Sequence, residues 1–419
     1  MKTILLTNSL FYPHLGGVEN SLYHIALELR HMGVQSVIMT SRRGLAGDEL
    51  PDHDEIEGIP VYRFHTKKRT GPTALLSVVE ELRESSALAA RISRDHHIWG
   101  VVARSHICGL GAIKALPGIP SIYIPPGVAK IQSNPILLNR SGSLVRRAGR
   151  WLNAHIQLPV QHSLQRRMLS RAGHVFAFSD VMRQQIWDEF AFDGLEILHP
   201  GVDGERFRQP ANKLEEPLRQ LHAVAPDEIV LLIVARINPS KGIDIALKAL
   251  AKLPDRFRLW IVGNGPDKFS LQKLAEELGL GQNRVQFFEP TRKPEEFYRA
   301  ADLFLMTSRY EPFGQTILEA HASGLPVVGF YKDSSQGILT ATEEIVMNGE
   351  TGFLIPFGVD NLVEVLCKYA SLSQQQIQTI EEKTRSYVVE KYSWERFCFS
   401  LVEKIDEMHQ REPLCNTVS

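Results

Sequence analysis

Short apolar runs alternate with longer amphipathic segments along most of the chain. The short runs have the length and composition of buried β-strands, and they lie at 3–7, 34–40, 59–64, 99–104, 174–179, 229–235, 257–262, 285–288, 303–306 and 326–330. The longer segments repeat apolar residues every three or four positions, which predicts helices with one buried face at 20–32, 74–94, 181–190, 268–278, 361–369 and 395–408. Regular alternation of strands and helices predicts an α/β protein built on parallel sheets.

The length of the chain indicates two domains, because 419 residues are too many for one hydrophobic core. Strand, glycine-rich turn, helix and strand at the start of the chain form the opening of a Rossmann-like half. The residues 208–227 mix proline, lysine, glutamate and glutamine without a clear apolar period, which is typical of a linker. The fully apolar strand at 229–235 then opens a second half.

Composition excludes several classes of protein. The formal net charge of −1, with 43% hydrophobic and 23% charged residues, gives no general attraction to nucleic acid or to a membrane. The four cysteines form no Cys-x-x-Cys pair, so we expect a reducing compartment and neither a disulfide framework nor a zinc site. The first apolar run, Ile4–Leu6, is too short for a signal peptide, and no stretch approaches the roughly 20 apolar residues of a membrane span. These features predict a cytosolic protein.

One strand–loop–helix–strand unit, from Ala301 to Phe330, carries the most specific chemistry. Glu311 lies in its loop and Glu319 lies about two turns into its helix. The free backbone N–H groups at the start of this helix, around Gly314, suit a phosphate or diphosphate. A nucleotide-sugar has a diphosphate between two hydroxylated rings. With its diphosphate at the helix start, one glutamate would reach each ring, so this arrangement fits a nucleotide-sugar. The alternative is an ordinary helix with two solvated glutamates.

A second group of candidate residues follows the strand at 229–235. Arg236 and Lys241 come at the carboxyl end of this buried strand, where they have no obvious role in building the fold. If they face the diphosphate, they neutralise charge on the leaving nucleotide as the glycosidic bond breaks. The alternative is a pair of solvated loop residues.

These motifs resemble a known family. Glu311-Pro-Phe-Gly, then Glu319-Ala, then Gly324-Leu-Pro-Val-Val is similar to the Glu-seven residues-Glu signature of the family 4, or group 1, glycosyltransferases. The resemblance implies the α/β fold called GT-B, in which two Rossmann-like domains face a cleft. It places the N-terminal, acceptor domain at 1–203 and the nucleotide-sugar donor domain at 204–390, with a C-terminal helix at 391–412 that crosses back to the N-terminal domain.

Two further positions are interpreted through the resemblance. Gly16 and Gly17 resemble the glycine loop that faces the donor across the cleft, although a plain tight turn is the alternative. The GxGxxG fingerprint is absent, so a nicotinamide cofactor is not supported. His106 follows the strand at 99–104, where a histidine of the family contacts the donor sugar; alone, a histidine here is more often structural.

The resemblance also implies a mechanism and a set of site residues. It implies retention of configuration without a metal or another cofactor, and no Asp-x-Asp motif with the usual surroundings is present. Glu311 would hold sugar hydroxyls, and Glu319 would hold the ribose. The catalytic residues so implied are His106, Glu311, Arg236 and Lys241. The donor-binding residues so implied are Gly16, Gly17, Arg236, Lys241, Gly263, Gly265, Glu311, Pro312, Phe313, Gly314, Gln315 and Glu319.

The substrates and partners are less determined. The family usually shows a Gly-Gly pair near the donor sugar, but here 333–342 intervenes, so a UDP-, GDP- or ADP-linked donor stays open. The acceptor is a sugar, a lipid-linked molecule or another small molecule, in polysaccharide, glycolipid or glycoconjugate biosynthesis. A basic amphipathic block at 130–171 is either a membrane or anionic-acceptor surface at the inner face of the membrane, or a helix with a solvated arginine face. No nucleic-acid-binding module accompanies it.

Three other functions compete with this one. A nucleotide-sugar epimerase or hydrolase of the same fold would act without an acceptor. A sugar phosphorylase would need a lysine that holds pyridoxal phosphate, and no lysine stands out. A catalytically silent scaffold would tend to lose Arg236, Lys241 or the glutamates, all of which are present.

Overall fold

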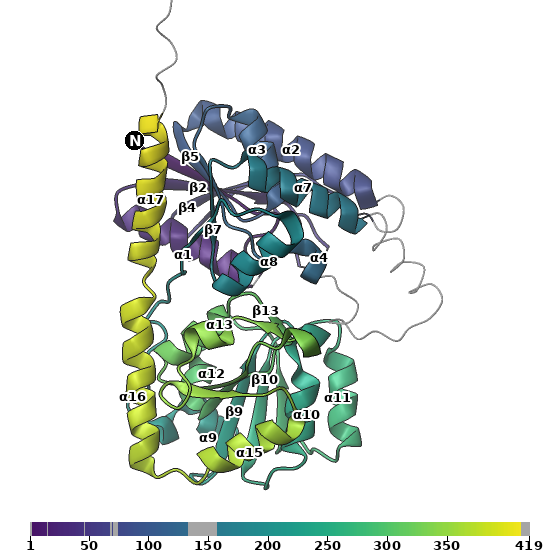
Figure 1. Cartoon of the computed structure of the whole chain (residues 1–419), viewed down its shortest axis with the longest axis vertical. Helices are drawn as coiled ribbons and strands as arrows, with labels where there is room; N and C mark the ends of the chain where they lie inside the picture. Colours follow the sequence, from purple (N-terminus) through teal and green to yellow (C-terminus); the bar gives the residue numbers. More distant parts are fainter. Residues whose placement is uncertain are drawn as a thin grey trace, which may run out of the picture.

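The computed structural model describes residues 2–132 and 157–411, apart from residues 15, 46, 68 and 70–73. The chain forms two lobes, each with a central sheet flanked by helices (Figure 1). The first sheet ends at Ile197 and the second begins at Ile229, so the predicted boundary at 203/204 falls between them. The predicted architecture of two Rossmann-like domains is confirmed.

The first lobe contains an eight-stranded sheet in the order β3-β4-β2-β1-β5-β6-β7-β8. All neighbouring strands are parallel except β3 and β4. After β4 the chain crosses from one side of β1 to the other, so the strand order reverses between β1 and β5. The strands are β1 (Thr3–Thr7), β2 (Gln35–Ser41), β3 (His53–Ile56), β4 (Ile59–Phe64), β5 (Ile98–Ala103), β6 (Ser121–Tyr123), β7 (His174–Ala177) and β8 (Glu196–Ile197).

Helices cover both faces of this sheet, because successive side chains of a strand point to opposite faces. In β1, Ile4 and Leu6 belong to the core that includes α1 and α17, whereas Leu5 belongs to the core under α2 and α3. The helices that precede the linker are α1 (Gly17–His31), α2 (Ala74–Asp95), α3 (His106–Ala115), α4 (Ala129–Gln132), α7 (Leu158–Arg171) and α8 (Asp180–Phe190).

The second lobe has a six-stranded parallel sheet in the order β11-β10-β9-β12-β14-β16. This is the Rossmann order, and it reverses between β9 and β12. Its strands are β9 (Ile229–Val234), β10 (Phe257–Val262), β11 (Val285–Phe288), β12 (Leu303–Met306), β14 (Val327–Phe330) and β16 (Gly352–Ile355). A separate two-stranded sheet pairs β13 (Tyr310–Glu311) with β15 (Leu339–Thr340). The helices are α9 (Pro217–Leu221), α10 (Ile243–Leu250), α11 (Lys268–Glu277), α12 (Glu295–Ala300), α13 (Gln315–Ala322), α14 (Thr342–Ile345) and α15 (Val359–Tyr369), with 3-10 turns at Lys213–Glu215, Pro239–Lys241 and Ser334–Gln336.

The last two helices tie the lobes together. Helix α16 (Gln374–Lys391) lies along the second lobe, and α17 (Trp394–Arg411) lies along the first, next to α1 (Figure 1). The chain therefore crosses back, as the resemblance implied. The two passages between the lobes contact each other, because Val202 N donates to Tyr392 O at 3.2 Å.

The segment at 208–227 is more than a linker, which corrects the sequence-based interpretation. It contains a 3-10 turn and α9, and Arg219 of α9 is only 2% exposed. The guanidinium of Arg219 donates to the carbonyls of Ala300 and Glu228 and pairs with Asp302 at 2.8 Å. These contacts of a buried arginine anchor the segment, and no apolar period in the sequence signals them.

A carboxylate of the second lobe caps a helix of the first. The oxygens of Glu344 accept hydrogen bonds from Asp180 N and Val181 N, both at 2.8 Å, at the start of α8. Free N–H groups at a helix start favour such an acceptor.

We expect Glu344→Ala to lower the free energy of unfolding, measured by urea denaturation, by about 1 kcal/mol, the usual contribution of a cap. Glu343→Ala, at the neighbouring exposed position, is the control; equal stability of both variants would contradict this role.

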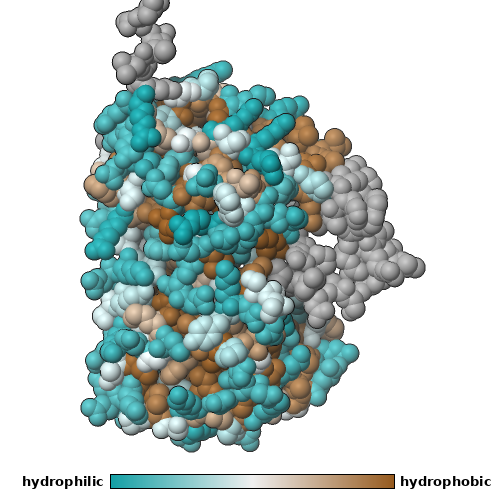
Figure 2. All heavy atoms as spheres, viewed as in Figure 1, coloured by the Kyte–Doolittle hydropathy of each residue, from teal (hydrophilic) through white to brown (hydrophobic). Residues whose placement is uncertain are grey.

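Most of the basic block, 133–156, lies outside the described residues. Of its described part, α7 packs on α3, with Arg166, Arg167 and Arg171 exposed, so this helix fits the packed alternative, and membrane contact stays a prediction. Figure 2 shows hydrophobic residues gathered over the first lobe at the upper right, and exposed Leu76 and Val79 belong to α2. Among the described residues, no helix is long and apolar enough to span a bilayer.

Candidate active site

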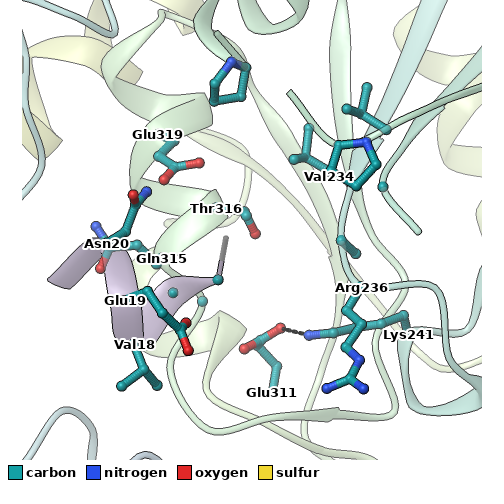
Figure 3. Close-up of a pocket in the computed structure, with 18 of the residues that line it drawn as sticks. Val18, Glu19, Asn20, Val234, Arg236, Lys241, Glu311, Gln315, Thr316 and Glu319 are labelled. Carbon is teal, nitrogen blue, oxygen red and sulfur yellow. Dashed lines mark hydrogen bonds and ion pairs between the residues drawn. The ribbon is translucent and has the colours of Figure 1, made fainter. Parts of the chain in front are cut away.

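A cavity of about 1220 Å³ lies between the two lobes. Its wall includes residues that follow β1 and β5 in the first sheet and β9 and β12 in the second. These are the positions where the strand order of each sheet reverses, and ligands of doubly wound sheets bind there. Figure 3 shows residues from α1, α13 and the loop after β9 directed toward this space.

The loop after β9 is fixed to the loop after β12. Arg309 donates to both oxygens of Asp244, at 3.0 Å each, and its backbone N donates to Ser240 O at 2.7 Å. The hydroxyl of Thr307 donates to Lys241 O at 2.9 Å. These bonds hold the turn that carries Arg236 and Lys241 against the strand end that leads to Glu311.

Lys241 and Glu311 form an ion pair inside the cavity (Figure 3). The ammonium of Lys241 lies 2.7 Å from Glu311 Oε2, and both side chains are largely buried. Glu311 belongs to β13 rather than to an irregular loop: Leu339 N donates to Arg309 O at 2.7 Å, and Ala341 N donates to Glu311 O at 2.9 Å. The segment 333–342, which departs from the family pattern, therefore supports the backbone of Glu311.

Two helices begin at the cavity from opposite sides. Gly314 precedes α13 with φ of 111°, a left-handed conformation that favours glycine, and no side chain caps this helix. Gly17 begins α1, and a Cβ on it would lie 4.0 Å from the Cβ of Gln315. The amide of Gln315 also donates to Gly201 O at 2.8 Å. The positive ends of both helix dipoles thus face the cavity.

The glycine turn after β10 packs behind the Arg236 loop. A Cβ on Gly263 would lie 2.0 Å from Ala235 O, and one on Gly265 would lie 2.0 Å from Ile237 O. Gly263 lines the cavity, whereas Gly265 does not. The structure therefore gives Gly265 a supporting position behind the loop, which differs from the predicted contact with the donor.

Glu319 lies on α13 and is only 6% exposed. Tyr298 Oη donates to its carboxylate at 2.8 Å. Burial raises the pKa of Glu319 to about 7, although the Tyr298 bond and the nearby charge of Arg206 oppose the shift. A carboxyl group that still lines the cavity at this depth can accept hydrogen bonds from a ligand with little competition from water.

Several charged groups that line the cavity have no ion-pair partner among the described residues. Arg206 pairs with Glu295, and Lys241 pairs with Glu311, whereas no pair is formed by Arg104, Arg236, Arg292 or Glu19. Burial raises the pKa of Glu19, and the nearby charges of His14, Arg104 and Arg236 oppose this shift. Over the whole wall, five arginine or lysine side chains face five glutamates. Burial raises the pKa of Glu19 and Glu319, which favours their neutral forms, so the basic side chains then outnumber the carboxylates.

His106 is placed differently from the prediction. It is the first residue of α3, and its Nε2 lies 2.5 Å from Gln161 Oε1 of α7. Burial lowers its pKa, and its side chain is not part of the cavity wall. The other predicted site residues all line the cavity apart from Gly265: Gly16, Gly17, Arg236, Lys241, Gly263, Glu311, Pro312, Phe313, Gly314, Gln315 and Glu319.

Sequence reasoning missed part of the wall. The most informative missed residues are Glu19, in the first turn of α1, and Arg104, directly after β5. A charged residue at the end of a buried strand was the signal that indicated Arg236, and the same signal was available for Arg104. Other residues of the wall that carried no assignment are Tyr12, His14, Asn20, Tyr23, Arg206, Arg292 and Thr316.

Family models match both lobes. Residues 16–200 match the model described as a glycosyl transferase 4-like domain, and residues 215–404 match the model described as glycosyl transferases group 1. The chain belongs to the group 1 glycosyltransferases. The recognition made from the Glu311 and Glu319 motif is therefore confirmed.

Several relatives and solved structures resemble this group 1 glycosyltransferase over part or all of its length. It is 39% identical over 143 residues to D-inositol 3-phosphate glycosyltransferase of Mycobacterium sp. (strain KMS), a match that spans 32% of the chain and 31% of that relative. Sucrose-phosphate synthase from Thermosynechococcus elongatus shares the fold, with a TM-score of 0.78 and 17% identity over 98% of the chain and 100% of that structure. Anabaena Alr3699/HepE in complex with UDP-glucose gives a TM-score of 0.73 and 20% identity over 97% and 99%.

Among the described residues of this group 1 glycosyltransferase, no group of three or more histidine, cysteine, aspartate or glutamate side chains is arranged to hold a metal ion. Positive charge in the cavity comes from two helix starts and from the side chains of Arg104, Arg206, Arg236, Lys241 and Arg292. That the reaction needs neither a metal nor another cofactor stays a prediction.

Proposed function

We propose that the protein transfers a sugar from a nucleotide diphosphate-sugar to an acceptor hydroxyl, in the biosynthesis of a glycoconjugate. One observation carries the proposal. The start of α13, Arg236, Lys241, Glu311 and Glu319 line one cavity at the point where the strand order of the second sheet reverses. Two similar proteins support the proposal. Anabaena Alr3699/HepE, which shares the fold, was solved in complex with UDP-glucose, and the mycobacterial relative by sequence is named a glycosyltransferase.

The diphosphate is proposed to lie at the start of α13, because free N–H groups and the helix dipole favour an anion there. Arg236 approaches from the loop after β9, and its guanidinium has no ion-pair partner among the described residues. The ammonium of Lys241 has three donors, so the bond to Glu311 leaves two for phosphate oxygens. The second oxygen of Glu311 is free to hold sugar hydroxyls.

The proposed step retains configuration and uses no metal. The acceptor oxygen forms a bond to the anomeric carbon on the face from which the nucleotide departs. The bond between that carbon and the phosphate oxygen breaks with its electron pair on the phosphate, which takes the proton of the acceptor hydroxyl. Arg236, Lys241 and the start of α13 stabilise the charge that develops on the leaving diphosphate.

Glu319 is proposed to bind the ribose of the donor. We expect Glu319→Ala to weaken nucleotide diphosphate binding roughly 10- to 100-fold, because hydrogen bonds to a charged group contribute about 1.5–3 kcal/mol. Titration calorimetry with UDP, GDP and ADP measures this. Tyr298→Phe, which removes the protein's own donor but leaves the carboxylate, is the control and should bind the nucleotide normally. Unchanged affinity in Glu319→Ala would contradict the role.

A panel of nucleotide-sugars tests the proposed function directly. The protein is incubated with each donor with and without candidate acceptors, and nucleotide release and the configuration of the product are measured, with and without EDTA. We expect release that requires an acceptor and persists with EDTA. Release at the same rate without any acceptor would instead identify a hydrolase or epimerase, and no release with any donor that binds would contradict catalysis.

A further inference from the structure

A buried arginine in the first lobe has no role in the steps described above. Arg104 directly follows β5, and its backbone N donates to Thr7 O at 2.8 Å, which continues the pairing of β5 with β1. The strand order of the first sheet reverses between these two strands. Arg104 therefore follows the strand across the reversal, which corresponds to β12 in the second sheet, whereas Arg236 follows β9; both residues line the cavity.

The side chain of Arg104 is buried but not satisfied. It is 2% exposed, and Nε and Nη1 have no hydrogen-bond partner. Its guanidinium carbon lies 4.3 Å from the ring centre of Phe178, which positions the planar group without supplying an acceptor. Burial lowers the pKa of Arg104 to about 10, so the group is charged at neutral pH.

An unpaired buried charge is expensive, because desolvation of an ion is offset only by a partner of opposite charge or by hydrogen bonds. Arg236 and Arg292 are also unpaired, but they are exposed to water. The nearby carboxylate of Glu19 affects the pKa of Arg104 and yet forms no ion pair with it. A ligand that brings its own negative charge into the cavity would satisfy Arg104.

We propose that Arg104 binds an anionic group, a phosphate or a carboxylate, of the acceptor. The inference rests on the proposed function, since it assigns the substrate class of the same cavity. The donor diphosphate is matched by Arg236, Lys241 and the start of α13 in the second lobe. None of the donor contacts proposed above uses Arg104, so its charge is left for the second substrate. The accepting molecule is then a phosphorylated or acidic sugar or polyol.

Inorganic phosphate tests the anion site without any turnover. In an Arg236→Met/Lys241→Met background, which lacks the side-chain cations assigned to the donor, titration calorimetry should still detect phosphate. Adding Arg104→Met should weaken this binding at least about 10-fold, the loss expected for a charge-assisted bond. Adding Arg94→Met, the same charge change at an exposed position of α2, should not. No phosphate binding in the background variant, or equal binding with and without Arg104, would overturn the proposal.

Acceptor kinetics test the assignment to the acceptor. The acceptors are glucose, glucose 6-phosphate and glucuronic acid, and the donor is the one that the nucleotide-sugar panel identifies. Arg104→Met should raise the KM of the two anionic acceptors at least about 10-fold, while the KM of glucose and the nucleotide affinity are unchanged. Arg104→Lys should recover part of the loss, and it replaces the Met variant if that variant does not fold. Weakened nucleotide binding in Arg104→Lys and Arg104→Met would overturn the assignment, and so would a KM for the anionic acceptors that is insensitive to Arg104.

The two proposals can fail separately. Phosphate binding that depends on Arg104, in a protein that transfers no sugar, would support the anion site and contradict the proposed function. Transfer to glucose 6-phosphate or glucuronic acid with equal KM in Arg104→Met and the unmodified protein would support the proposed function and contradict the anion site for the acceptor.

Discussion

Lys241→Met is expected to lower the rate of sugar transfer about 100- to 1000-fold, the usual loss when one preorganised donor to a developing oxyanion is removed. The ammonium of Lys241 is held beside Glu311 by the bonds of the loops after β9 and β12. It therefore needs no rearrangement as charge grows on the leaving phosphate. The effect should fall mainly on kcat, measured by nucleotide release at saturating donor and acceptor.

Two variants separate this role from a structural one. Lys248→Met removes a lysine from α10 that pairs with Asp244 of its own helix and does not line the cavity, so it should keep full activity. In Lys241→Met the carboxylate of Glu311 is left unpaired. The double variant Lys241→Met/Glu311→Gln replaces this carboxylate with a neutral amide. If activity returned in this double variant, the loss in the single variant would come from Glu311, and the role of Lys241 in stabilising the phosphate would be contradicted.

Glu319→Gln is expected to make the protein more stable above neutral pH. The carboxyl group of Glu319 ionises with its ordinary pKa of 4.5 in the unfolded chain and with a pKa of about 7 in the folded chain. Between these pH values the folded protein keeps a proton that the unfolded chain has lost, so its free energy of unfolding falls as pH rises from about 4.5 to about 7. At pH 8 the penalty is complete, and the difference between the two pKa values corresponds to roughly 3 kcal/mol.

Urea denaturation of the variant and the unmodified protein at pH 5 and pH 8 measures this difference. The gain from Glu319→Gln should be small at pH 5 and approach roughly 3 kcal/mol at pH 8. His321, on the same helix, has a pKa that burial lowers to about 3, so its protonation destabilises the fold as pH falls from 6.5. Both proteins carry His321, so its contribution cancels in the comparison. An equal gain at both pH values would contradict a buried, high-pKa carboxyl group.

The sheets were largely predictable from the sequence, because buried parallel strands are short apolar runs between polar turns. The runs at Thr3–Thr7, Ile59–Phe64, Phe257–Val262, Val285–Phe288 and Leu303–Met306 match observed strands to the residue. Helix α16 was not predicted, since it buries only Thr384 and Val388. It begins instead with a capping box at Ser373 and is fixed by Arg385, which donates to backbone carbonyls of the preceding passage. Polar anchoring of this kind leaves no period in the sequence.

Most of the candidate site was predictable from the motifs that follow β9 and β12. Arg236, Lys241, Glu311 and Glu319 line one cavity, as their positions indicated. His106 was assigned by resemblance, and it fails to reach the cavity because it starts α3, where the ring turns toward α7. Arg104 comes two residues earlier, still in register with the sheet. Which residue of a short turn faces the cavity depends on the helix that follows, and strand periodicity does not encode this.

The two passages of the chain between the lobes meet at Val202 and Tyr392. Because both covalent links lie together on the edge marked by α16 and α17 (Figure 1), any swing of one lobe about the other has its pivot there. The largest displacement then occurs at the far rim. Such a swing would separate Glu344 from the first turn of α8, so an opening of the cleft would break the two hydrogen bonds that Glu344 accepts there.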